Sequence, residues 1–221
     1  MRHDDRKGVP SGRQLYADAL TIVLREGVEL IRPLLKAGKE PGLSGALFVF
    51  SELTAKMAAP LVKDVIPHIR PLGPWARWEL IEGLQWHSDK LSPKEIVAFL
   101  QYCGDSESNV RHKISQAIAF IPLSKLGEAA TILPPSPTRD FHLEGIRLQL
   151  QPFSDDAVKA ALAKSNSVLN CYVFATFYRE ACLERYHLIP KNYPEADREY
   201  LEGMIISKKR MNKMKLRKKK K

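Results

Sequence analysis

Residues 105–118 read DSESNVRHKISQAI, a run of short polar residues followed by an amphipathic stretch. The apolar residues Val110, Ile114 and Ile118 recur at four-residue steps, which places them on one face of a helix. This stretch decides the fold class, because its spacing is helical and the same spacing recurs along most of the chain. It predicts a turn followed by a helix over residues 107–120.

The rest of the sequence repeats this pattern, and no run alternates between apolar and polar residues as a strand would. We therefore predict an all-α protein. Most of the 15 prolines fall between the expected helices or in their first turns, where proline is tolerated. The expected helices cover residues 13–36, 44–57, 61–69, 74–87, 93–102, 107–120, 123–132, 138–150, 155–164 and 168–186.

Two helix starts carry strong local signals. Ser92 is followed by Pro93 and, three residues on, by Glu95, which is the sequence of a capping box. Ser154 is followed by two aspartates, whose negative charge is favoured at the start of a helix. We expect both serines to cap helices.

An internal repeat is also visible. Helix-opening segments begin near residues 46, 77, 111, 142 and 172, at separations of 31, 34, 31 and 30 residues. Three of these segments contain a small residue, namely Gly83, Ala117 or Gly145. Small residues at these positions predict a close approach between adjacent helices.

The segment from Asp105 to Arg111, with the apolar residues after it, resembles the inter-helix turn and second helix of HEAT-like repeats, a group related to armadillo repeats. In that family an aspartate in the turn and a Val-Arg pair, here Val110 and Arg111, tie neighbouring units together. The resemblance implies a right-handed α-solenoid of about five antiparallel helix pairs. From the sequence as a whole we predict a flexible N-terminus over residues 1–12, a helical-repeat domain over 13–190, a capping helix over 191–207 and a disordered basic tail over 208–221.

The formal net charge of +10 is concentrated at one end. Ten of the 35 basic residues lie in residues 208–221, so the 25 that remain balance the 25 acidic residues of the body. A basic run of this kind is typical of a solvated tail or of a segment that contacts nucleic acid, an acidic protein or an anionic membrane. The candidate binding residues in the tail are Lys208, Lys209, Arg210, Lys213, Lys215, Arg217 and Lys218.

The sequence offers little catalytic chemistry. The six histidines are scattered, no nucleophile or phosphate-loop motif is present, and we expect no metal, no cofactor and no enzymatic activity. Three cysteines without a C-x-x-C pair predict free, buried thiols in a reducing compartment. No signal peptide is visible and no apolar run reaches about 18 residues, so we expect a cytoplasmic protein without a transmembrane segment.

Trp75, Trp78 and Trp86 occupy one helical stripe, which is explained either by core packing or by an aromatic binding surface. We take Trp75, Trp78 and Arg111 as candidate binding residues. The leading functional hypothesis is a non-enzymatic scaffold that engages a protein partner, one form of which is an immunity-type inhibitor of a toxin. The alternatives are a protein that binds nucleic acid through its tail and a HEAT-like DNA glycosylase.

Overall fold

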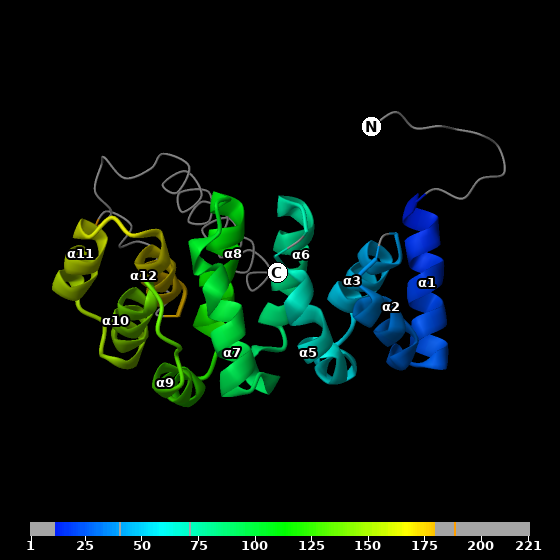
Figure 1. The fold of residues 1–221 in the computed structure, drawn as a ribbon, viewed down its shortest axis with the longest axis horizontal. Helices are drawn as coiled ribbons and strands as arrows, with labels where there is room; N and C mark the ends of the chain where they lie inside the picture. The colour runs from blue at the N-terminus through cyan, green and yellow to red at the C-terminus, as the bar shows by residue number, and fades with distance from the viewer. Residues whose placement is uncertain (1–11, 40, 71, 180–187, 189–221) are drawn as a thin grey trace, which may run out of the picture. The chain divides into compact units, whose positions relative to one another are not determined.

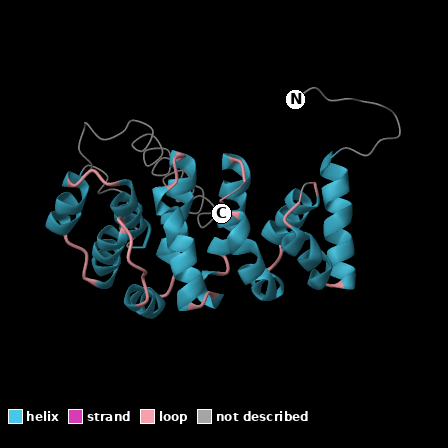
Figure 2. Cartoon of the chain, in the orientation of Figure 1, coloured by secondary structure: helices cyan, strands magenta, loops and turns pink. Residues whose placement is uncertain are grey.

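The computed structural model describes residues 12–39, 41–70, 72–179 and 188. Throughout these residues the chain forms helices and the loops between them, with no strand (Figure 2). The predicted all-α class is confirmed. The capping helix and basic tail predicted over residues 191–221 lie outside the described residues, as does the predicted flexible N-terminus apart from Gly12, which begins a helix.

The chain divides into two compact units, Met1–Lys90 and Leu91–Lys221. The sequence predicts one helical-repeat domain over residues 13–190, and the boundary between the units falls inside that range. Each unit has its own buried apolar side chains, and each is described separately below.

In unit 1, α3 is the central helix and packs against α1, α2 and α6. Its core includes Phe50 of α3 and Ile81 of α6, which are both fully buried. The elements are α1 (Gly12–Glu26), η1 (Val28–Ile31), α2 (Arg32–Ala37), α3 (Gly42–Glu52), α4 (Ala55–Ala58), η2 (Ala59–Leu61), α5 (Val62–Val65), η3 (Ile66–His68), α6 (Pro74–Gln85) and η4 (Ser88–Lys90).

The single long helix predicted over residues 13–36 is wrong, because the chain breaks at Gly27. The φ and ψ angles of Gly27 are 114° and 149°, a region that side-chain-bearing residues rarely adopt. The Gly27 amide donates to the Val23 carbonyl at 2.9 Å, after which the chain turns away into η1. The apolar periodicity of the sequence continues across Gly27, so periodicity alone predicts an uninterrupted helix.

The next two predicted helices are also interrupted, and prolines lie within the second interruption. The helix expected over residues 44–57 ends at Glu52, and the helix expected over 61–69 is divided among η2, α5 and η3. Pro60 lies inside η2 and Pro67 inside η3. Proline has no amide hydrogen and crowds the preceding turn, so each one favours a short 3₁₀ segment over a continuous α-helix.

In unit 2, α12 lies at the centre and packs against α8, α10 and α11, while α9 packs against α7 and α10 (Figure 1). Every residue of α12 between Val168 and Phe177 is buried, so this helix has no solvent-facing side along that length. The elements are α7 (Pro93–Leu100), η5 (Gln101–Gly104), α8 (Ser108–Phe120), α9 (Leu123–Thr131), α10 (Arg139–Leu150), α11 (Asp155–Ala163) and α12 (Ser167–Arg179).

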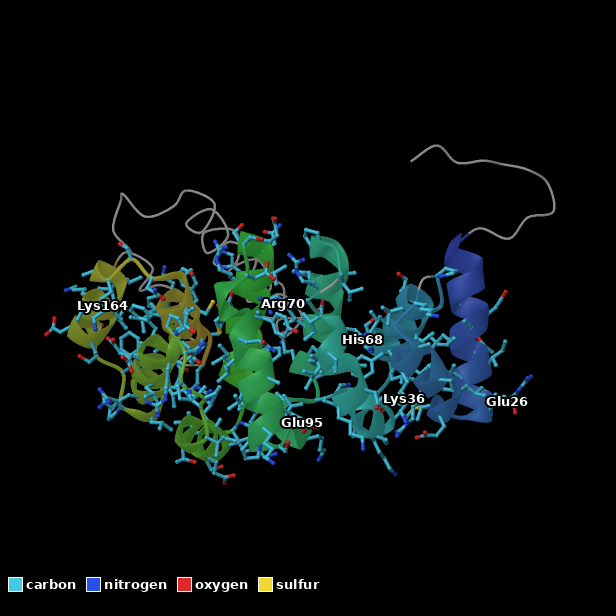
Figure 3. The ribbon with its side chains drawn as sticks, viewed as in Figure 1. Glu26, Lys36, His68, Arg70, Glu95 and Lys164 are labelled. Atoms are coloured by element: carbon cyan, nitrogen blue, oxygen red, sulfur yellow. The ribbon has the colours of Figure 1, made fainter. Side chains whose placement is uncertain are left out.

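Both predicted helix caps are confirmed. Glu95, labelled in Figure 3, accepts the Ser92 amide at 2.8 Å, and the Ser92 hydroxyl accepts the Glu95 amide at 3.4 Å. The Ser154 hydroxyl accepts the Ala157 amide at 3.4 Å at the start of α11. These bonds satisfy amides that have no partner within the first turn of a helix.

Two of the three small residues, Gly83 and Gly145, lie at close contacts between helices, as predicted. A Cβ atom placed on Gly83 of α6 would lie 3.1 Å from Phe50 Cε1 and 3.3 Å from Ser51 Cα of α3. A Cβ atom placed on Gly145 of α10 would overlap the ring of Tyr172 on α12. Glycine is therefore required at Gly145 for α10 and α12 to approach as they do.

Candidate interaction surface

Arg111, a predicted binding residue, holds the turn before its own helix. Its Nη1 atom donates to the carbonyl oxygens of Asp105 and Ser106, both at 2.8 Å. The Asp105 carboxylate accepts the Glu107 amide at 2.9 Å in the same turn. The HEAT-like resemblance implies that these residues tie neighbouring units, whereas the bonds described here close the loop between η5 and α8.

Two other arginines make the same kind of bond. Arg77, in the first turn of α6, donates from Nη1 to the Leu72 carbonyl at 2.6 Å. Arg139, the first residue of α10, donates from Nε to the Leu133 carbonyl at 3.2 Å. In each case a half-buried guanidinium near the start of a helix reaches back five or six residues to the preceding loop. We call Arg77, Arg111 and Arg139 the loop-clamping arginines.

The tryptophans of the predicted stripe lie in α6 and directly after it. Trp75 is the second residue of α6, and Trp78, one turn later, has a half-buried side chain. Trp86 follows the last residue of α6 and is 59% exposed. The core-packing interpretation of this stripe is therefore wrong for Trp86.

The remaining predicted site residues belong to the tail. Lys208, Lys209, Arg210, Lys213, Lys215, Arg217 and Lys218 lie outside the described residues. The structure therefore leaves their role as a prediction from sequence.

A buried polar contact between α10 and α12 could not be anticipated from sequence. His142 Nδ1 and the Tyr172 hydroxyl oxygen lie 2.9 Å apart, and the two rings meet edge to face with centroids 5.9 Å apart. Burial lowers the pKa of His142 from 6.5 to about 4 and, together with nearby thiols, raises the pKa of Tyr172 well above 10. Both groups are therefore neutral near pH 7, as expected for a structural hydrogen bond.

This polar contact extends along the same two helices. Gln149 Nε2 donates to the Tyr172 carbonyl at 2.7 Å and to the Thr176 hydroxyl at 2.6 Å. Arg179, at the end of α12, donates from Nη2 to the Ile118 carbonyl at 2.9 Å and to the Ile121 carbonyl at 3.1 Å. These bonds hold α10, α12 and the junction between α8 and α9 in fixed relative positions.

Large apolar side chains are exposed at that junction and at the end of α10. Phe120, Leu123 and Leu150 are 53%, 39% and 46% exposed. Leu150 extends toward α9, since a Cβ atom on Gly127 would lie 4.0 Å from Leu150 Cδ1. Leu123 and Gly127 are four residues apart on α9 and so share a face. We call Phe120, Leu123, Gly127 and Leu150 the α9 patch.

Unit 1 also exposes apolar side chains. Ile22 and Leu24 of α1, Leu30 of η1 and Leu34 of α2 are each between 44% and 52% exposed. Leu34 packs against Gly42 of α3, since a Cβ atom there would lie 3.1 Å from Leu34 Cδ2.

The described residues contain no group of three or more histidine, cysteine or acidic side chains placed to hold a metal ion. Among the described helices, none combines the length and the apolar character needed to span a bilayer. Comparison of the chain with protein-family models, with curated proteins and with solved structures found no match.

Proposed function

We propose that this chain is a non-enzymatic binding protein that engages a protein partner through the α9 patch. The observation that carries the proposal is the exposure of two large apolar side chains, Leu123 one turn from Gly127 and Leu150 against it, on helices that a buried hydrogen-bond network holds in place. Exposed apolar clusters on a rigid scaffold are typical of protein–protein contact sites, because their burial supplies most of the binding free energy.

The proposed scaffold is a HEAT-like α-solenoid. Two features support it: the loop-clamping arginines, which recur at the start of α6, α8 and α10, and the small residues that let paired helices approach closely. Helical repeats build extended surfaces that bind other macromolecules. An inhibitor of the immunity type, which covers part of a toxin, is one concrete form of this function.

The experiment compares capture of partners by the full chain and by the double variant Leu123→Asp/Leu150→Asp. Both leucines are exposed, so we expect the variant to fold. Leu24→Asp is the matched control, because Leu24 is similarly exposed, at 52%, and lies in unit 1. Captured proteins are identified by quantitative mass spectrometry at high salt, which suppresses contacts made by the tail.

We expect one protein to be captured by the wild type and by Leu24→Asp, and to be lost from the double variant. Titration calorimetry with the purified partner should then show a drop in affinity of at least about 100-fold for the double variant, the effect of losing two apolar anchors. Equal affinity of all three chains would overturn the proposal.

A second candidate function rests on the ten basic residues between Lys208 and Lys221. We propose as the alternative that this tail binds nucleic acid through phosphate contacts. The test measures binding of fluorescent duplex and single-stranded oligonucleotides to the full chain and to a chain ending at Ser207, across a salt series. Binding that requires the tail and weakens steeply with salt would support the alternative, and absence of binding by the full chain would remove it.

A further inference from the structure

Two of the three cysteines meet in the core of unit 2. Cys103 belongs to η5 and Cys171 to α12, and these two elements pack together. The Cys171 thiol donates to the Cys103 carbonyl, with Sγ and O 3.4 Å apart, and to the Arg111 carbonyl at 3.7 Å. The side chains of Cys103 and Cys171 are buried, at 0% and 1% exposed.

The two thiols also interact with each other. Burial is the larger cause that raises the pKa of Cys103 well above 9, and a hydrogen bond with the Cys171 thiol adds to it. In the closed structure Cys103 is thus a neutral thiol shielded from solvent, and such thiols react slowly. Oxidation of the pair therefore requires η5 to separate transiently from α12.

We propose that Cys103 and Cys171 form a reversible disulfide that fastens η5 to α12 when the protein meets hydrogen peroxide. The peroxide transfers one oxygen atom to the first thiol, which becomes a sulfenic acid, and releases one water molecule. The second thiol then attacks the sulfenic sulfur, forms the S–S bond and releases a second water molecule. Two thiols are oxidised and one peroxide is reduced to two waters.

The positions of the two cysteines predict that this cross-link would stabilise the folded state of unit 2. The two cysteines are 68 positions apart, and α8, α9, α10 and α11 all lie between them. A bond that closes so long a segment restricts the unfolded chain strongly and so favours the folded state. η5 also leads into the turn that Arg111 holds, so the cross-link would secure that turn to α12.

The test treats the folded full chain with hydrogen peroxide and maps disulfides by mass spectrometry of unreduced peptides. Cys182 lies outside the described residues, and Cys182→Ser removes the third thiol as a potential competitor. We expect a linked pair of peptides containing Cys103 and Cys171, two hydrogens lighter than the separate peptides, in both the wild type and Cys182→Ser. Dithiothreitol should restore both thiols.

Two further measurements complete the test. The linked protein should melt on the order of 10 °C higher than the reduced protein. Cross-linking should accelerate in urea concentrations below the unfolding transition, because opening is then more frequent. Absence of the linked pair in Cys182→Ser, or a linked protein that melts lower than the reduced one, would overturn the proposal.

Discussion

Gly145 of α10 faces the ring of Tyr172 so closely that no other residue fits at that position. A Cβ atom there would overlap the Cγ and Cδ2 atoms of the tyrosine. Tyr172 is itself fully buried and its hydroxyl is hydrogen-bonded to His142, which restricts movement of its ring. This pair sets the distance between α10 and α12.

Gly145→Ala should therefore destabilise unit 2 by about 1–3 kcal/mol, since one methyl group must displace a packed aromatic ring. Urea unfolding followed by circular dichroism measures the change. Gly127→Ala is the matched control, because its Cβ atom would make ordinary contact with Leu150 and alanine favours a helix over glycine by up to about 1 kcal/mol. If both variants were equally stable, the close contact between Gly145 and Tyr172 would not limit the packing.

Tyr172→Phe removes the hydroxyl and leaves the buried Nδ1 atom of His142 without this hydrogen bond. We expect a loss of about 1–3 kcal/mol in the free energy of unfolding, the usual cost of an unsatisfied buried polar group. Tyr178→Phe is the comparison, because the Tyr178 hydroxyl accepts a longer bond of 3.3 Å from Gln116 in a half-buried position. Tyr178→Phe should cost less, and the reverse order would contradict the assigned role of Tyr172.

Stability should fall in mild acid because of His142. Burial lowers its pKa from 6.5 to about 4, so between these pH values the unfolded chain binds a proton that the folded chain does not. The free energy of unfolding should therefore be highest above pH 6.5. It should fall progressively as the pH is lowered toward 4, by roughly 3 kcal/mol in total.

Urea unfolding at a series of pH values measures this dependence. His142→Gln keeps a polar side chain but has no proton to gain, so its unfolding free energy should vary less between pH 6.5 and pH 4 than that of the wild type. Parallel curves for the two proteins would show that His142 does not cause the dependence.

Arg111→Ala should lower the free energy of unfolding by about 1–3 kcal/mol, because the carbonyls of Asp105 and Ser106 lose a charged donor. Arg147→Ala is the control, since Arg147 is exposed on α10 and its loss should cost under about 0.5 kcal/mol. Thermal denaturation of both variants gives the comparison. If Arg111→Ala were as stable as the wild type, the structural role proposed for the loop-clamping arginines would be wrong.

Local features of the fold were predictable from sequence. The caps at Ser92 and Ser154 follow from side chains that reach only three residues along the chain. The burial of Cys103 and Cys171 follows from the general tendency of free cysteines. The break at Gly27 was missed because a glycine within an apolar stripe has the same pattern whether its φ angle is negative or positive.

The candidate site was less predictable, because it depends on contacts between distant segments. The bond between His142 and Tyr172 spans 30 residues and that between Arg179 and Ile118 spans 61, and neither leaves a periodic signal in sequence. In the sequence, Leu123 and Leu150 have the pattern of ordinary apolar helix residues. Only the packing of α9 on α10 shows that both side chains are exposed.

The position of Arg179 makes the α9 patch and α12 energetically linked. Its guanidinium donates to the carbonyl of Ile118, in the last turn of α8, and to that of Ile121, in the turn that leads from Phe120 to Leu123. Displacement of the end of α12 would therefore break two bonds that support this turn. Linkage is reciprocal: whatever binds the intact patch also favours the docked state of α12. Binding of a partner to the patch would then slow hydrogen–deuterium exchange of the backbone amides in the last turn of α12, which the partner does not contact.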